Sequence, residues 1–206
     1  MSKAESAIKW MEDTAKDDRH GYCQTHRWGE DGDYDCSSAV YTAWEHAGIP
    51  VKTYSFEKYG CAYTGVMLAV FKHFGFEDVT NKVNLATGAG LKRSDSLLND
   101  KHHVAMNCGN GMEVEASINE KGTATGGTPG DQTGKEFLIR AYRNYPWNHV
   151  LRYPDGGSTS VTKKSVDEVA KEVLAGAWGK GDARKNALTA AEYNYTDVQT
   201  TENQLL

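Results

Sequence analysis

Apolar residues recur at intervals of three and four along the first third of the chain, the spacing of a helix that is buried on one side. Glycine or proline stops two of these runs: Gly48 and Pro50 follow one, and Gly75 follows another. A long polar loop, residues 18–35, separates the first run from the second. The pattern predicts three helices, at residues 4–17, 36–47 and 64–74.

The pattern becomes β-like after Leu91, where apolar and polar residues form short stretches that are typical of half-buried strands. Asn110-Gly111 lies between two of these stretches and is a strong signal for a two-residue hairpin turn. Helices followed by an antiparallel sheet predict an α+β fold for this part of the chain. The expected strands lie at Leu97–Leu98, Val104–Met106, Met112–Ala116, Phe137–Tyr142 and His149–Tyr153.

A third pattern begins after Tyr153. Residues 154–164 are rich in glycine, serine and threonine, which is typical of a linker. The segment 165–206 predicts a small all-α domain of three short helices. The chain therefore divides by pattern into residues 1–153, a linker and residues 165–206.

Charge and composition exclude several partners. The 206 residues carry a formal net charge of −5, so we expect no broad attraction to nucleic acid or to anionic membranes. Residues 1–6 hold no apolar signal core, and no stretch approaches the ~18 consecutive apolar residues of a membrane-spanning helix. We therefore expect synthesis in the cytoplasm without a signal peptide.

The cysteines, Cys23, Cys36, Cys61 and Cys108, are irregularly spaced. Their even number would allow two disulfides, but synthesis in the cytoplasm favours free thiols. Cys23 and His26 have the spacing of half a zinc site, yet no second pair accompanies them. We therefore expect no metal and no cofactor.

Cys36 is the strongest candidate for a nucleophile, because it opens the second predicted helix. The free N–H groups and the dipole at such a terminus stabilise a thiolate, the reactive form of cysteine. The alternative is a half-buried structural cysteine. The long loop before it is a good place for substrate contacts. We expect Tyr22, Trp28, Asp35 and Ser37 to bind substrate, although Trp28 could instead only pack the loop down.

A cysteine nucleophile needs a base and a third group that orients the base. His103 opens a predicted core strand, where a histidine can face the start of a packed helix. Across the Asn110-Gly111 hairpin, Glu115 is a polar residue in an otherwise apolar strand, and its carboxylate can hold the imidazole. The alternatives are a histidine at the edge of a sheet and a glutamate that faces solvent.

The segment Tyr34-Asp35-Cys36-Ser37-Ser38 resembles the nucleophile motif of the NlpC-type papain-like cell-wall peptidases, in the phage-lysin branch of the Pal amidases. His103-Val104-Ala105-Met106 is similar to the His-Val-Gly-Ile strand of that family, with Ala105 in place of the glycine. Glu115 stands where the family usually has a histidine. The resemblance covers residues 5–153 and implies a papain-like fold in which the cysteine, the histidine and the glutamate are catalytic.

Residues 165–206 resemble the three-helix wall-binding repeat of the Cpl-type phage lysins. The resemblance implies binding to the glycan and peptide units of peptidoglycan, with Trp178 and Arg184 as the expected contacts. An aromatic ring can stack on a sugar face, and an arginine can pair with a carboxylate. Alternatively, Trp178 is part of the core of this small domain. A single repeat predicts weak binding unless the protein forms an oligomer.

Together the two resemblances predict a phage endolysin that hydrolyses an amide of bacterial peptidoglycan by cysteine catalysis. The N-acetylmuramoyl-L-alanine amide is favoured through the similarity to Pal, and an amide within the stem peptide is the alternative. A non-catalytic wall-binding protein and a transglutaminase-like acyl transferase are two further hypotheses. Such a lysin would be made in the host cytoplasm and would act at the wall after release by a separate holin-type partner.

Overall fold

A computed structural model describes residues 1–154, 166–174, 176–178, 181–190 and 193–205 of the chain. The chain forms two compact units, Met1–Ser158 and Thr159–Leu206, and each is described by itself. Apart from residue 154, the expected linker at residues 154–164 lies outside the described residues. No helix in the described ranges is both long and apolar enough to cross a membrane.

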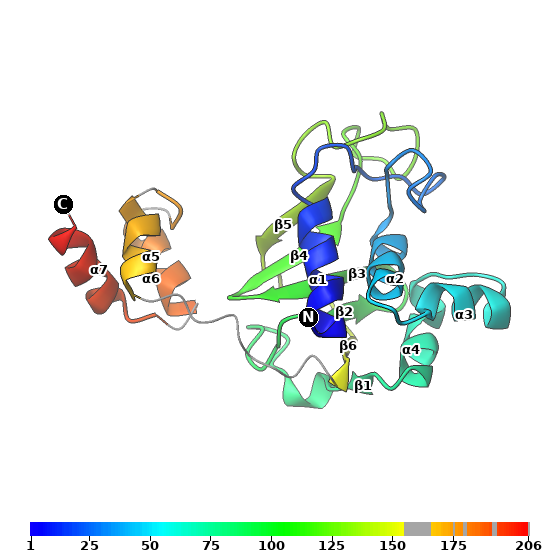
Figure 1. The fold of residues 1–206 in the computed structure, drawn as a ribbon, viewed down its shortest axis with the longest axis horizontal. Helices are drawn as coiled ribbons and strands as arrows, with labels where there is room; N and C mark the ends of the chain where they lie inside the picture. The colour runs from blue at the N-terminus through cyan, green and yellow to red at the C-terminus, as the bar shows by residue number, and fades with distance from the viewer. Residues whose placement is uncertain (155–165, 175, 179–180, 191–192, 206) are drawn as a thin grey trace. The chain divides into compact units, whose positions relative to one another are not determined.

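Helices form the first half of the first unit (Figure 1). Three of them correspond to the helices that the apolar spacing predicts. At the start of α1, the Ser2 hydroxyl accepts a hydrogen bond from the Glu5 amide. A fourth helix, α3, begins directly after Pro50. Their bounds are Lys3–Thr14 for α1, Cys36–His46 for α2, Val51–Tyr59 for α3 and Thr64–His73 for α4.

The sequence pattern did not predict α3, for a physical reason. Only Val51 and Ser55 of this helix are buried, so it has no apolar stripe that repeats along its length. In the sequence pattern, Pro50 indicates the end of the preceding helix. A proline also suits the start of the next helix, because the first residues of a helix need no N–H partner within it.

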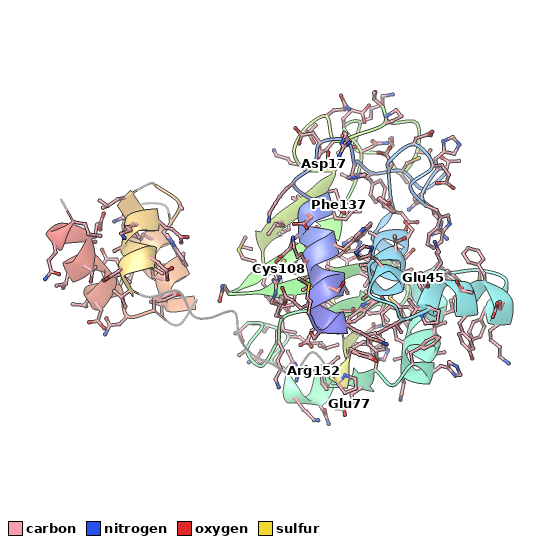
Figure 2. The ribbon with its side chains drawn as sticks, in the orientation of Figure 1. Asp17, Glu45, Glu77, Cys108, Phe137 and Arg152 are labelled. Carbon is pink, nitrogen blue, oxygen red and sulfur yellow. The ribbon has the colours of Figure 1, made fainter. Side chains whose placement is uncertain are left out.

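A six-stranded antiparallel sheet follows in the order β1-β6-β2-β3-β4-β5, so the unit is a mixed α+β structure, as predicted. The short 3₁₀ helix η1 lies at Thr80–Lys82. At one edge of the sheet, Glu77 on β1 pairs with Arg152 on β6 (Figure 2). The strands are β1 at Glu77–Asp78, β2 at Ser96–Asn99, β3 at His103–Gly109, β4 at Met112–Ala116, β5 at Phe137–Ala141 and β6 at His149–Arg152.

The two faces of this sheet bury different side chains, because successive residues of a strand point to opposite sides. Val104 and Met106 of β3 belong to the large core that includes residues of α1, α2 and α4. Ala105 of the same strand packs with Trp147 and Val150 in a second, smaller core. The starting residue of β3, His103, shares a strand face with Ala105 and therefore lies on the side of Trp147.

Strands β3 and β4 form a hairpin whose turn is the expected Asn110-Gly111 pair. Both residues have positive φ, 52° for Asn110 and 70° for Gly111, as the favoured two-residue hairpin turn requires. Antiparallel pairing sets Met106 opposite Val114 and Asn107 opposite Glu113. Glu113 and Glu115 therefore share the sheet face of Asn107 and His103.

In the second unit the described residues form α5 at Val166–Leu174, α6 at Gly181–Ala190 and α7 at Tyr195–Gln204, close to the three helices expected there. They enclose a small apolar core of their own. Asn194 caps α7 by accepting a hydrogen bond from the Thr196 amide. The buried core residues are Val169, Ala170, Val173, Leu188, Tyr193 and Val198.

We expect Gly111→Ala to lower the free energy of unfolding by about 1 kcal/mol, because a Cβ is strained at positive φ. Urea denaturation measures this change. Asn110→Gly is the control at the neighbouring turn position, and it should stay within about 0.5 kcal/mol of the parent protein. Equal midpoints for the parent and Gly111→Ala would contradict the turn assignment.

Candidate active site

The start of α2 is fixed by a capping box around Asp35. The Asp35 carboxylate accepts a hydrogen bond from the Ser38 amide at 2.7 Å, and the Ser38 hydroxyl accepts one from the Asp35 amide at 2.9 Å. Cys36 is the first residue of the helix. Local sequence therefore decides where the helix begins and places the cysteine at its positive end.

Arg27 ties the long loop to this helix start. Its guanidinium donates to the Asp35 carboxylate at 2.6 Å, to the Ser37 hydroxyl at 3.1 Å and to the Ala62 carbonyl at 2.6 Å. Asp35 and Ser37 are both buried. Sequence reasoning expected these two residues to bind substrate, and the structure gives them partners inside the protein.

Cys36 is 8% exposed, and its thiol lies against the backbone amide of Val104 at the start of β3. Burial raises the pKa of this thiol to about 12, and the negative charge of Asp35 acts in the same direction. Hydrogen bonds from the amides of Val104 and Ser37 lower the pKa but do not offset burial. The prediction of a stabilised thiolate is therefore wrong for the substrate-free protein: the helix terminus is present, but desolvation is the larger effect.

His103 and Glu115 form a buried pair. The Nε2 atom of His103 lies 2.6 Å from a carboxylate oxygen of Glu115, whose side chain is completely buried. An ionised carboxylate can only accept hydrogen bonds, so Nε2 carries a hydrogen, and in the neutral imidazole Nδ1 has the lone pair. The ring stacks on Trp147, with centroids 5.9 Å apart, and meets Tyr145 edge-on at 5.5 Å.

Glu115 is also held by two arginines that sequence reasoning missed. Arg140 donates to its Oε1 atom at 3.1 Å, and Arg143 forms an ion pair with its Oε2 atom. Burial alone would raise the pKa of Glu115, but the hydrogen bond and charge of His103 with the charges of Arg143 and Arg140 hold it below its usual value. Arg140 is on β5, opposite Glu113 of β4. The alternation of residues along β5 could therefore have indicated that Arg140 is on the sheet face of the two glutamates. Arg143 comes from a loop, and no sequence pattern pointed to it.

The expected nucleophile and base lie at neighbouring positions of β3 but on different faces of the sheet: Cys36 packs in the large core with Val104, whereas His103 faces Trp147. The thiol reaches the strand at Val104, whereas the ring neighbours of His103 are Glu115, Tyr145 and Trp147. Within the described part of the chain, no hydrogen bond joins Cys36 to His103. Catalytic hydrogen bonds often form only when substrate is bound, so the missing hydrogen bond does not exclude Cys36 and His103 as nucleophile and base.

The two expected loop residues differ in their surroundings. Tyr22 is buried, and its pKa is raised, first by burial and then by the neighbouring charge of Cys36, which places its hydroxyl near the thiol. Trp28 is half-buried and meets Phe56 edge-on at 5.5 Å. The Arg27 guanidinium lies 4.8 Å from the centre of the Trp28 ring. Trp28 therefore packs the loop onto α3, and its contact with substrate stays a prediction.

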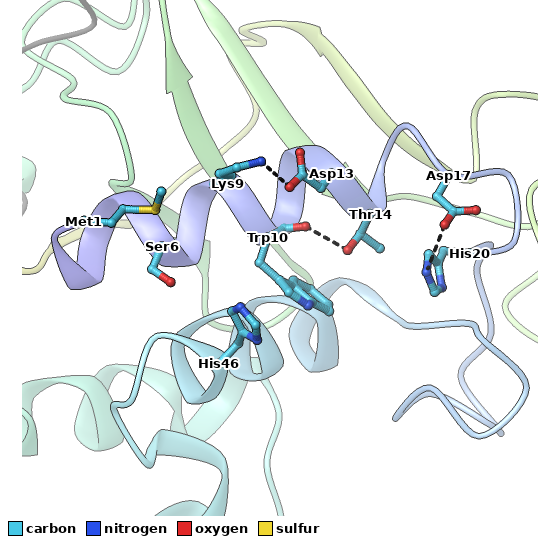
Figure 3. A pocket seen from close by; sticks show the side chains of 9 residues that line it. All are labelled: Met1, Ser6, Lys9, Trp10, Asp13, Thr14, Asp17, His20 and His46. Atoms are coloured by element: carbon cyan, nitrogen blue, oxygen red, sulfur yellow. Dashed lines mark hydrogen bonds and ion pairs between the residues drawn. The ribbon is translucent and has the colours of Figure 1, made fainter.

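A groove of about 450 Å³ lies elsewhere in the first unit, beside α1 and α2 (Figure 3). Trp10 and His46 line it from the two helices, with Asp17 and His20 from the following loop. Neither Cys36 nor His103 lines this groove. Among the described residues, no cluster of histidine, cysteine or acidic side chains could hold a metal ion.

In the second unit, both expected wall contacts have partners within the unit. Trp178 packs on the small core, meets Tyr193 edge-on at 5.9 Å and donates its indole N–H to Glu172 at 3.1 Å. Arg184 forms an ion pair with Glu202 at 3.0 Å. Residues 179–180, in the turn expected beside Trp178, lie outside the described residues. Direct wall contact by either side chain stays a prediction.

Comparison with known families gives two matches. Residues 28–114 match the family model of the endolysin-like domain, and residues 167–206 match that of the CW_7 repeat, a cell-wall repeat. The comparison with curated proteins finds no match. Cys36 and His103 fall within the first match, and Trp178 and Arg184 within the second. Together the two matches support a cell-wall-targeting endolysin.

Because its pKa is raised to about 12, Cys36 should react slowly with iodoacetamide at pH 7.5 in the substrate-free protein. The less buried Cys61 should react first. The Cys36 rate should rise about tenfold for each pH unit up to pH 10, because the thiolate fraction rises in that proportion. Peptide mapping by mass spectrometry follows both sites. Faster alkylation of Cys36 than of Cys61 at pH 6.5 would show a thiolate already paired with an imidazolium.

Proposed function

We propose that this protein is a phage-type endolysin that hydrolyses an amide bond of peptidoglycan, with Cys36 as the nucleophile. One observation supports the proposal most: the completely buried Glu115 holds His103 at the start of β3, beside the amide against which the Cys36 thiol lies. A buried carboxylate with a histidine partner is unusual in a purely structural sheet. The match to the endolysin-like domain covers the same segment up to residue 114.

In the proposed mechanism, the thiol transfers its proton to Nδ1 of His103 as the sulfur attacks the amide carbonyl. Glu115 fixes the hydrogen on Nε2, so that Nδ1 is the atom able to accept the proton. The tetrahedral intermediate expels the amine, which takes the proton from His103. Water, activated by the same imidazole, then hydrolyses the thioester and regenerates the thiol.

The raised pKa of Cys36 decides how the proton moves. A thiol that is neutral at pH 7 has to be deprotonated during the attack, so His103 acts as a general base and not as the partner of a preformed thiolate. The backbone N–H of Cys36 is in the first turn of α2, where a helix has no internal acceptor for it. This N–H is free to stabilise the oxyanion of the intermediate.

We favour the N-acetylmuramoyl-L-alanine amide as the bond that is cut, and an amide within the stem peptide is the alternative. The CW_7 repeat is proposed to keep the enzyme on its insoluble substrate, with avidity from an oligomer if one repeat binds weakly. We propose host-cytoplasmic synthesis and a separate holin-type release partner. A binding role without catalysis and acyl transfer to an amine remain competing hypotheses.

Mass spectrometry of purified peptidoglycan digested by the parent protein and by Cys36→Ala tests the proposal. We expect free stem peptides that begin with alanine, beside intact glycan chains, from the parent protein only. Fragments cut within the stem would identify an endopeptidase. Equal products from both proteins would exclude Cys36 as the nucleophile, and no products from either would favour a binding role. Incorporation of an added amine would reveal acyl transfer.

The adjacent residues His102 and His103 provide a matched pair of variants that tests which histidine is the general base. We expect His103→Ala to lower the hydrolysis rate by about 100-fold or more, the usual size of general acid–base catalysis. His102→Ala should keep nearly full activity, because His102 is exposed and precedes the strand. Initial rates of peptidoglycan solubilisation compare the two. The opposite result would move the base to His102, which shares a strand face with Val104.

A further inference from the structure

Arg143 connects two buried acidic residues beside the proposed base. Its guanidinium donates to Oε1 of Glu113 at 2.8 Å and forms an ion pair with Oε2 of Glu115. Both glutamate side chains are completely buried, whereas the Arg143 side chain is 32% exposed. The sequence motifs around the cysteine and the histidine include none of these contacts.

We infer that Arg143 is a positioning residue, which keeps the Glu115 carboxylate ionised and directed at Nε2 of His103. The inference rests on the proposed function, because it assigns a role to Arg143 in that same reaction. It goes further because it adds a fourth residue to the nucleophile, the base and the orienting carboxylate. This residue, Arg143, acts on the base through Glu115.

The charge balance of the cluster supports this role. Glu113 and Glu115 are on the same face of β4, and the charge of Glu115 raises the pKa of Glu113. A buried carboxylate without a cation tends to take up a proton instead of staying charged. Burial does raise the pKa of Glu113, with the charge of Glu115 adding to it, whereas Glu115 stays below its usual value. The charge of Arg143 contributes to the lowered pKa of Glu115, after the hydrogen bond and the charge of His103.

The geometry of the Glu115 carboxylate also supports a positioning role for Arg143. Oε2 of Glu115 faces both His103 and Arg143, and Oε1 accepts from Arg140 at 3.1 Å. Donors on both oxygens prevent the carboxylate from rotating away from the imidazole. Arg143 shares the oxygen that His103 uses, whereas Arg140 binds the other one. We therefore expect Arg143 to have the larger effect on His103.

The loop that carries Arg143 also covers the imidazole. Between β5 and β6, the loop supplies Tyr145, whose ring lies 5.2 Å from the Arg143 guanidinium, and Trp147, which stacks on His103. The Trp147 indole donates to the carbonyl of Arg143 at 3.3 Å. One short segment therefore fixes the ring plane of His103 and the charge behind it.

The test compares Arg143→Met, Arg143→Lys and a matched control, Arg152→Met. The control removes an arginine at the end of β6 that is 15% exposed and binds Asp95, the buried residue just before β2, at 2.6 Å. Rates are measured on soluble glycan-peptide fragments of peptidoglycan from pH 3.5 to 8, with thermal melting to confirm folding. We expect Arg143→Met to lower kcat by about 10- to 100-fold with little change in KM, since a displacement of about 1 Å can have this effect.

The pH profile separates positioning from a merely structural role. Loss of the Arg143 charge makes a positive charge on His103 less unfavourable, so the acidic half-maximum of kcat, where the base becomes protonated, should move upward by about one unit. Arg143→Lys should restore the half-maximum but only part of kcat, because an ammonium keeps the charge without the two-point contact. Arg152→Met should leave the half-maximum unchanged even if it melts at lower temperature.

One outcome would overturn the inference on Arg143 alone, and a different outcome would overturn the proposed function. If the parent protein hydrolyses the fragments and Cys36→Ala does not, but Arg143→Met keeps the parent kcat and pH profile, the inference on Arg143 fails alone. If the parent protein and Cys36→Ala give the same rates, the proposed function fails. Nitrogen NMR of His103 provides a readout without substrate: the hydrogen should reside on Nε2 in the parent protein and exchange between both nitrogens in Arg143→Met.

Discussion

The buried charge of Glu115 constrains the rest of the first unit. A carboxylate inside a sheet is stable only when donors surround it, and here one imidazole and two guanidinium groups do so. Those donors come from β3, from β5 and from the loop before β6. The pairing of three successive strands, β3, β4 and β5, and the path of the loop after them therefore have to be correct before this charge is compensated. The same requirement fixes the ring of His103, so the stability of the sheet and the orientation of the proposed base depend on one cluster.

At the other side of β3, the start of α2 shows how burial can outweigh local electrostatics. The capping box and the helix terminus favour negative charge at Cys36, yet the thiol is almost completely desolvated and lies beside Asp35. The resting site is therefore neutral at the sulfur and charged at Glu115. Such a division suits a nucleophile that is activated only as substrate arrives, and it protects the thiol from other electrophiles.

The two matched families agree with the two compact units of the chain. The endolysin-like domain match lies within the first unit and the CW_7 repeat within the second. In the second unit, Trp178 and Arg184 stabilise a core that is small for a domain of this length. Their side chains show why a residue that resembles a binding residue in sequence can serve packing first: a short three-helix unit has few other large side chains to bury.

The sequence by itself determined the local features. Apolar spacing gave α1, α2 and α4, the Asn110-Gly111 pair gave the hairpin, and the Asp35 cap located Cys36 at a helix start, because each depends on neighbouring residues. The hairpin also set Glu115 near His103. Only the tertiary structure decided the burial that raises the pKa of the thiol, the aromatic residues that His103 faces and the contacts of Arg143 with two glutamates. These depend on burial and on contacts between residues 28 or more positions apart, such as Glu115 and Arg143, which no local pattern encodes.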